Sequence, residues 1–176
     1  MVDEVERLGG SQADSPFAGG LNLNEIAVAG HSLGGLAALL SLKEDTRFKA
    51  AIMLDESLSA GSADMTERPV LVLAMGREQW SDEECRLRSH LHGPRFAVNF
   101  KGADHVTPSD VVWLEGCHQN RHHGPEMTIE ALRDYVAGFL DANLQGKPAG
   151  RLLTGSSSEC PDITVTTQEQ TLCHLP

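Results

Sequence analysis

Residues Ile26 to Lys43 read IAVAGHSLGGLAALLSLK, and this stretch decides the fold. Small and β-branched residues lead into Gly30, a serine follows between glycines at position 32, and the remainder is almost entirely apolar and favours a helix. A short apolar run that passes through glycines into a helical run predicts a buried strand, a sharp turn and a buried helix. The pattern therefore sets one hydroxyl at the junction of a strand and a helix.

The rest of the chain repeats this alternation. After the strand that ends at Gly30, apolar runs predict strands ending at Leu54, Met75 and Phe100. A helix that opens with a capping box is predicted after residue 81, and residues 128–144 carry an apolar stripe typical of an amphipathic helix. Alternating strands and helices predict an α/β fold with a parallel sheet and flanking helices.

The chain divides into three parts by composition. Residues 1–23 suggest a short helix and a turn-rich linker, residues 24–145 the α/β core, and residues 146–176 a Ser/Thr-rich tail with at most one short strand. The 176 residues are enough for one domain with a core of its own.

Charge and hydropathy exclude several classes of partner. The formal net charge of -11 argues against nucleic acid or an anionic membrane surface, because both attract basic patches. No apolar run approaches the roughly 18 to 20 residues that span a bilayer. The first ten residues lack the features of a signal peptide, yet the localisation stays open between the cytoplasm and secretion. The four cysteines form no CxxC pair, and a disulfide between Cys160 and Cys173 is one alternative.

The turn at GHSLGG predicts a nucleophile. A serine hydroxyl attacks a carbonyl only when a base takes its proton and the backbone presents it, and the G-x-S-x-G turn supplies the presentation. We expect Gly30 and Gly34 to leave room around Ser32, and Gly35 to allow close packing behind it. The backbone N–H of Leu33 is the expected donor to the oxyanion.

The partners of this serine are expected at later strand ends, in the order serine, acid, histidine. Asp55 directly follows the strand that ends at Leu54, and Glu78 follows the next strand as the competing acid. His105, in FKGADHVTPSD after the last parallel strand, is the expected base.

The other seven histidines are not expected to act as the base. His31 adjoins the serine, and it is expected to line the pocket because neighbouring side chains on such a turn diverge. The cluster from His118 to Gly124 could bind a metal, but a solvated loop is the favoured interpretation, and no metal or cofactor is predicted. The remaining histidines lie at the end of a polar helix, in a polar loop or in the tail: His90, His92, His118, His122, His123 and His174.

With these residues the chain resembles the α/β-hydrolase superfamily, and within it the platelet-activating factor acetylhydrolase type, which includes the plasma and type II enzymes and their bacterial and fungal relatives. The motifs that carry the resemblance are GHSLGG, EDTRFKAAIMLD and GADHVTPSD, and it covers about residues 24–142. It implies Ser32 as nucleophile, Asp55 as orienting acid and His105 as general base. Chlorophyllases and cutinase-like polyester hydrolases share parts of the pattern.

The resemblance implies a serine carboxylic-ester hydrolase that acts on short acyl esters or on acetyl and oxidised acyl groups of phospholipids, with a small-molecule or lipid ester as its partner. It also implies strands ahead of the first predicted one, together with a second oxyanion donor, which this sequence lacks. We therefore expect the C-terminal part of the fold, with residues 26–30 as an exposed apolar edge. A weakly active or non-catalytic fragment, acting as an interaction module or associating with a second copy through that edge, is the alternative.

Overall fold

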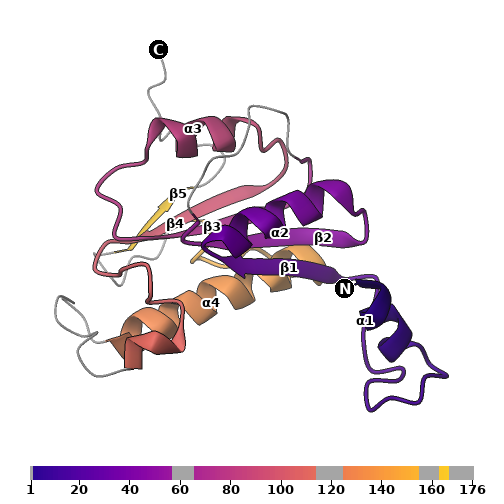
Figure 1. Cartoon of the computed structure of the whole chain (residues 1–176). Coiled ribbons are helices and arrows are strands. Elements are labelled where there is room, and N and C mark those ends of the chain that lie inside the picture. The colour runs from indigo at the N-terminus through magenta and orange to yellow at the C-terminus, as the bar shows by residue number, and fades with distance from the viewer. Residues whose placement is uncertain (1, 57–65, 114–124, 155–162, 167–176) are drawn as a thin grey trace.

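The fold is a five-stranded sheet between helices. The computed structural model describes residues 2–56, 66–113, 125–154 and 163–166. The strands are β1 (Ile26–His31), β2 (Phe48–Leu54), β3 (Val70–Met75), β4 (Arg95–Phe100) and β5 (Ile163–Thr166). They lie side by side in chain order, β1 to β4 parallel and β5 antiparallel to β4 (Figure 1).

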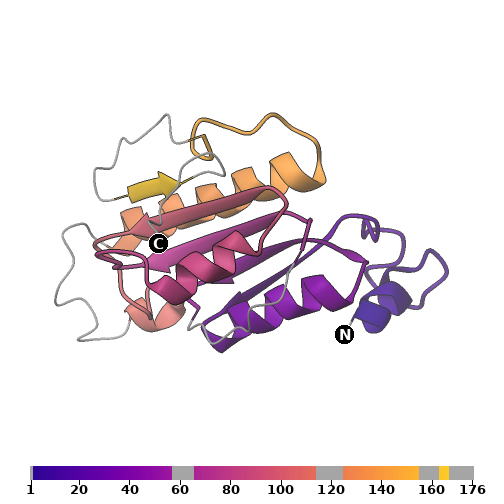
Figure 2. The same cartoon turned by 90° about the horizontal axis from the view of Figure 1, so that it is seen from above.

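Helices cover both faces of this sheet. On one face lie α2 (Leu33–Glu44) and α3 (Asp82–Ser89), and on the other lies α4 (Pro125–Leu144), as Figures 1 and 2 show. The predicted strands and helices are thus present. The last long helix begins at Pro125, three residues earlier than its apolar stripe indicates, because proline suits the first turn of a helix. A 3₁₀ turn, η1 (Asp110–Trp113), precedes it.

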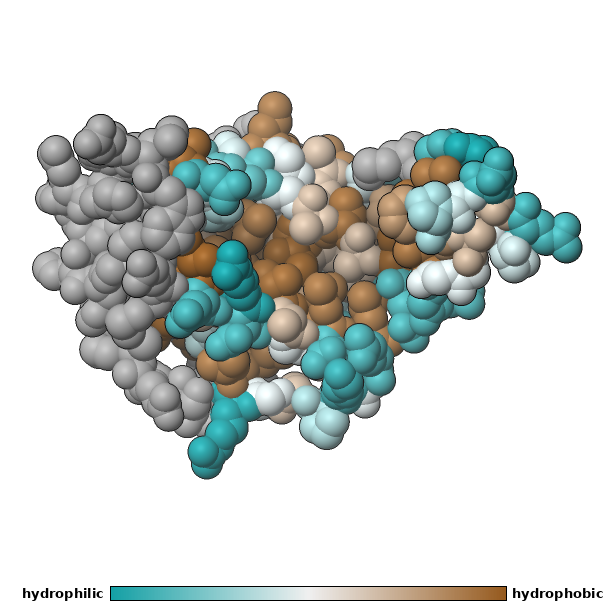
Figure 3. All heavy atoms as spheres, turned by 90° about the horizontal axis from the view of Figure 1, so that it is seen from below, coloured by the Kyte–Doolittle hydropathy of each residue, from teal (hydrophilic) through white to brown (hydrophobic). Residues whose placement is uncertain are grey.

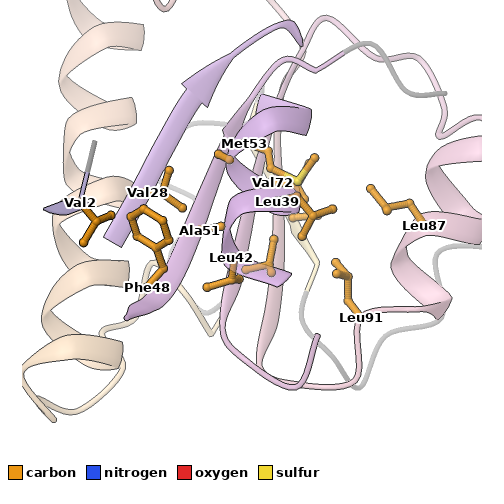
Figure 4. Close-up of a cluster of buried hydrophobic side chains, with 13 residues drawn as sticks. Val2, Val28, Leu39, Leu42, Phe48, Ala51, Met53, Val72, Leu87 and Leu91 are labelled. Atoms are coloured by element: carbon orange, nitrogen blue, oxygen red, sulfur yellow. The ribbon is translucent and has the colours of Figure 1, made fainter. Parts of the chain in front are cut away.

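The core on the α2 and α3 face is made mainly of aliphatic side chains, with Phe48 among them. Leu39 and Leu42 of α2 are fully buried against β2 and its neighbours, and Leu87 of α3 closes the cluster (Figure 4). The helix α2 is apolar on nearly all sides, as expected for a helix that a sheet largely buries. Burying each of these side chains contributes about 1.5–3 kcal/mol.

The core on the opposite face depends on the stripe of α4. Tyr135 and Phe139 are buried there, and their rings meet Phe100 and Phe96 edge-on at centroid distances of 5.8 and 6.0 Å. Aromatic pairs favour this edge-to-face geometry. Further apolar residues of α4, Leu132, Val136 and Leu140 among them, are only partly buried. In the view of this face the centre is apolar and polar residues surround it (Figure 3).

The first strand is an edge of the sheet, as expected. The strand order begins with β1, which pairs only with β2 among the described strands. Val28 is the one β1 residue that is buried, and Ala29 is exposed, whereas every residue of β3 is buried. The edge strand β1 is therefore less covered than the interior strand β3.

Segments at both ends of the chain also contact the core. The helix α1 (Val2–Gly9) places Val2 beside Phe48, and its acidic residues pair with Arg47, at 2.5 Å for Asp3 and 2.9 Å for Glu6. From the tail, β5 pairs with β4, and the side chain of Leu153 is fully buried.

Two further properties bear on the expectations above. Cys85 of α3 is disulfide-bonded, and the other three cysteines, the expected pair Cys160 and Cys173 included, lie outside the described residues. Within the described part of the chain, the helices are too short or too polar to cross a bilayer.

Candidate active site

The turn between β1 and α2 holds Ser32 in a strained conformation. Its φ of 56° and ψ of -126° lie outside the favoured regions for a residue with a side chain. The backbone is fixed there, because Ser32 N donates to Leu54 O at 2.8 Å and Gly35 N donates to Ser32 O at 2.9 Å. Serine in this position usually caps the helix, yet the Ser32 side chain makes no capping bond. The hydroxyl is therefore left free of the helix.

The three glycines of the turn contribute in different ways. A Cβ on Gly30 would lie 2.0 Å from Gly34 O, and one on Gly35 would lie 3.1 Å from Gly30 O. At both positions the backbone of a neighbouring residue comes so close that glycine is favoured. We expected Gly34 to be needed because a side chain there would crowd the turn. This is wrong, because a Cβ at Gly34 meets no described atom within 4 Å. The crowding comes from the Gly34 carbonyl, which points at Gly30.

The carboxylate of Asp55 is buried and held at the end of β2. Asp55 is 3% exposed and, with a φ of 41°, is the second of two non-glycine residues with positive φ in the described chain. Its Oδ1 accepts from Met75 N at 2.9 Å and pairs with Arg77 Nη2 at 3.0 Å. Strained residues of this kind cluster at functional sites because the surroundings hold them in place.

The imidazole of His105 meets the free oxygen of that carboxylate. Its Nδ1 donates to Asp55 Oδ2 at 2.7 Å, a distance typical of a hydrogen bond to a charged acceptor. The loop that carries it is braced from within, since Thr107 Oγ1 donates to Asp104 Oδ1 and accepts from Asp104 N, both at 3.0 Å. About half of the His105 side chain remains exposed.

His31 contacts this loop and is not among the residues that line the cavity described below, so its expected place in a substrate pocket stays a prediction. Its Nε2 donates to the His105 carbonyl at 2.8 Å, and the two rings lie 4.6 Å apart. The side chain reaches from the end of β1, next to Ser32, to the loop after β4. It thereby helps to fix the position of His105, the expected base. Sequence position alone could not distinguish lining the pocket from bracing the loop.

The structure brings Ser32, His31, Asp55 and His105 to the carboxyl ends of neighbouring parallel strands. Within the described chain the Ser32 hydroxyl makes no hydrogen bond. Of the expected nucleophile, acid and base, the structure thus joins Asp55 and His105 by a hydrogen bond. Catalytic hydrogen bonds are often longer in the absence of substrate. Leu33 begins α2 and is 71% exposed, and its N–H is one of the donors that a helix leaves unpaired at its start.

Glu78, the competing acid, lies apart from this arrangement. It is exposed in the loop after β3, and it forms no hydrogen bond or ion pair with another described residue. Asp55 and not Glu78 therefore contacts His105.

A cavity of about 450 Å³ opens beside Asp55 and His105. The loops after β2 and β3 and the start of α3 line it, with Glu56, Arg77 and Glu84 among the lining residues. Sequence reasoning missed these three residues. A signal was available, because Glu56 and Arg77 follow the last residues of β2 and β3 at the same edge of the sheet as Asp55.

Glu56 is a buried acid, and the cation near it, Arg77, donates to its backbone carbonyl at 3.5 Å. It is 3% exposed, and its Oε2 has no hydrogen-bond partner among the described residues. Burial raises the pKa of Glu56 to about 8, and the nearby charge of Glu84 adds to this increase. The side chain is therefore protonated at neutral pH.

The described residues contain no cluster of histidine, cysteine and acidic side chains that could hold a metal. The segment from His118 to Gly124 lies outside them, so the expectation of a solvated loop there stays a prediction.

Comparison with known proteins identifies a matching family and a similar solved structure. Residues 5–130, which are 126 of the 176, match the family model described as platelet-activating factor acetylhydrolase, isoform II. Among solved structures the chain is similar to a ferulic acid esterase from Streptomyces cinnamoneus, with 26% identity and a TM-score of 0.75. The match covers 96% of this chain and 54% of that one, so the chain spans about half the length of the esterase. A search of curated proteins gives no match.

Proposed function

This chain belongs to the platelet-activating factor acetylhydrolase isoform II family, and from that membership and the geometry of its site we propose that it hydrolyses carboxylic esters with Ser32 as nucleophile. His105 acts as general base and Asp55 orients it. The similar structure is itself an esterase, which supports the same class of reaction.

One observation carries the proposal: a buried carboxylate accepts a 2.7 Å hydrogen bond from His105 at the strand end next to the turn of Ser32. This contact joins two side chains and is not part of the backbone hydrogen bonding of the sheet or of α2. A carboxylate that binds Nδ1 fixes the imidazole tautomer with Nε2 free to accept a proton, and it stabilises the imidazolium that results. Such a histidine contacts His31, the residue before the uncapped Ser32, and a base of this kind is what a serine nucleophile requires.

In the first half of the reaction, Ser32 Oγ attacks the ester carbonyl carbon while Nε2 of His105 takes the hydroxyl proton. The Leu33 N–H donates to the oxygen that becomes negative. The C–O bond to the leaving group then breaks, and the proton on His105 passes to the departing alcohol. The products are the free alcohol and an acyl group on Ser32.

In the second half, water replaces the alcohol. His105 takes a proton from the water as its oxygen attacks the acyl carbon, and the bond to Ser32 Oγ breaks as the serine recovers the proton. The carboxylic acid leaves, and the site returns to its starting state. The residues described here need no cofactor for either half.

The substrate class follows from the family. Short acyl esters, or acetyl and oxidised acyl groups of phospholipids, are the proposed substrates, and chlorophyllase-like or polyester substrates are alternatives. The similar structure is named for ferulic acid, so an aromatic acyl group is one more candidate. Thioester hydrolysis or acyl transfer would use the same three residues.

A fluorophosphonate probe tests the proposal, because it modifies only an activated serine. We expect stoichiometric labelling of the wild-type chain and none of Ser32→Ala, with hydrolysis of p-nitrophenyl acetate lost in parallel. Ser41→Ala, on the same helix, is the control and should label normally. Labelling that survives in Ser32→Ala would refute the assignment. Rates on p-nitrophenyl esters of increasing length and on methyl ferulate then identify the acyl group.

A second candidate function rests on the edge of the sheet. The outer edge of β1 is unpaired within the described chain, and the face beside it is partly apolar (Figure 3). An exposed apolar edge strand is a template for pairing with another chain. The chain would then serve as an interaction module, or as one half of a pair of identical copies.

The probe experiment separates the two candidates. An absence of labelling in a folded wild-type chain favours the module, and Ser32-dependent labelling favours the enzyme. Sedimentation equilibrium over a range of concentrations shows whether two copies associate, and it does so whatever the outcome of the labelling.

A further inference from the structure

We infer that Arg77 is a positioning residue for the proposed reaction, which holds the Asp55 carboxylate so that one oxygen faces His105. The inference rests on the proposed function. The role that it assigns to Arg77, which also lines the cavity beside His105, is exerted through the contact of its side chain with the acid.

The two oxygens of Asp55 have separate partners. Oδ1 accepts from Met75 N at 2.9 Å and pairs with Arg77 Nη2 at 3.0 Å, and Oδ2 accepts from His105 Nδ1 at 2.7 Å. A carboxylate held by a single contact can still rotate about its side-chain bonds. The two contacts on Oδ1, one from the last residue of β3 and one from the loop after it, leave Oδ2 for the imidazole.

Arg77 is itself fixed by its neighbours. The side-chain amide of Asn99 clamps its backbone, accepting from Arg77 N at 3.0 Å and donating to Arg77 O at 2.7 Å. Nη1 of the guanidinium donates to Met75 O at 3.2 Å, and Nε donates to Glu84 Oε1 at 2.9 Å. Asn99 is 5% exposed in β4, so the clamp is anchored in the sheet.

Glu84 in turn is held by the start of α3. Its Oε2 accepts from Ser81 N at 2.7 Å while Ser81 Oγ accepts from Glu84 N at 3.2 Å, which is the predicted capping box. The second oxygen of the same carboxylate is therefore available to Arg77. The helix cap, the guanidinium and the proposed catalytic acid form one connected chain of contacts.

The charged groups in this chain of contacts favour the cationic form of Arg77. Burial opposes the charge on Arg77, but the hydrogen bond to Glu84 and the charges of Asp55 and Glu84 raise the pKa of Arg77 above its ordinary value. It is therefore a permanent cation next to the acid. The titratable and charged groups that surround it and His105 are Asp55, Glu56, Glu83, Glu84 and His31.

The contact with Arg77 has a predictable effect on catalysis. Removing the guanidinium should free Asp55 to rotate, so that the carboxylate no longer holds the His105 imidazole in one orientation, and kcat falls. KM should stay nearly unchanged, because the effect passes through Asp55 and His105, whereas the loss of a residue that bound the substrate would raise KM.

The test compares Arg77→Met with Arg86→Met by kcat and KM for p-nitrophenyl acetate from pH 5 to 9. Arg86 is exposed on α3 and forms no ion pair with a described residue, so it controls for the loss of one charge. For Arg77→Met we expect kcat to fall about 10- to 100-fold with KM nearly unchanged. Arg86→Met should match the wild type.

Two further variants keep the test decisive if Arg77→Met does not fold. Arg77→Lys keeps the positive charge but not the planar guanidinium, and it should recover part of the kcat that Arg77→Met loses. Glu84→Gln keeps an acceptor for the helix cap but weakens the hold on Arg77, and should lower kcat without changing KM. Thermal unfolding of each variant identifies those that are folded.

The outcomes separate this inference from the proposed function. An absence of Ser32-dependent turnover in the wild type overturns both. Ser32-dependent turnover together with an unchanged kcat, or with a loss confined to KM, in folded Arg77 variants overturns the role of Arg77 alone.

Discussion

The two halves of the proposed catalytic centre are built in different ways. At the ends of β2 and β3, Asp55 lies in a buried polar network that includes Arg77, Glu84 and Asn99. At the end of β1, Ser32 is held only by its backbone, on a strand whose outer edge has no partner in the described chain. Side chains fix the acid and the base, whereas the shape of a turn fixes the nucleophile.

This difference shows where each half is vulnerable. Burying ionic groups costs desolvation energy that their attraction often only offsets, so the network around Asp55 contributes more to geometry than to stability. The turn of Ser32 has no such network, and its geometry depends on the absence of side chains at glycines. Substitutions should therefore act on activity in the first region and on folding in the second.

The largest expected effect is on the acid. Asp55→Asn should lower kcat by about 10⁴-fold, because the amide no longer fixes the reactive tautomer of His105. Glu78→Gln is the matched control and should retain wild-type activity. Steady-state hydrolysis of p-nitrophenyl acetate measures both. If Glu78→Gln abolished activity and Asp55→Asn did not, the acid would be misassigned.

The next effect concerns the turn. Gly30→Ala places a methyl group 2.0 Å from Gly34 O, and we expect it to lower the free energy of unfolding by at least ~3 kcal/mol. Gly34→Ala meets open space at the start of α2 and should stay within ~1 kcal/mol of the wild type, because alanine favours helix. Urea unfolding compares the two. Equal losses would contradict the one-sided crowding of the turn.

The smallest effect concerns the pH dependence of stability. Glu56 has a pKa of about 8 in the folded chain against an ordinary 4.5, so the folded state binds its proton more tightly than the unfolded state. Its contribution to stability is complete below about pH 4.5 and is lost as the pH rises toward about 8, at up to about 1.4 kcal/mol per pH unit.

Glu56→Gln should remove this slope. Urea unfolding at pH 5 and pH 7 should show a loss of stability that is about 2 kcal/mol smaller in the variant than in the wild type. Glu78→Gln, which removes an exposed carboxyl group, should keep the wild-type slope. A variant with the full wild-type slope would show that Glu56 does not bind its proton in this way.

The local parts of the structure could be predicted from the sequence. The apolar runs gave the four parallel strands, and the spacing of Ser81 and Glu84 gave the capping box of α3, because these signals lie within a few residues of one another. The turn at Ser32 was recognisable from its glycines. Asp55 and His105 could be proposed because each directly follows a predicted strand.

Contacts between distant segments could not be predicted in this way. Arg77 meets Asp55 across 22 positions, and His31 meets the His105 carbonyl across 74, with no periodicity that marks either pair. The burial of Glu56 depends on the elements packed around it. The open Cβ position at Gly34 reflects the direction of one carbonyl, which a glycine in a motif does not reveal.

The double use of Glu84 limits how the chain can be engineered. One oxygen of this side chain stabilises the first turn of α3, and the other holds Arg77. Replacing Glu84 with a residue of higher helix propensity would remove the oxygen that accepts the hydrogen bond from Arg77 Nε. The guanidinium of Arg77 would then be held less firmly. Thermostability and turnover are thus linked at this residue, and gains in heat resistance are better sought elsewhere on the surface.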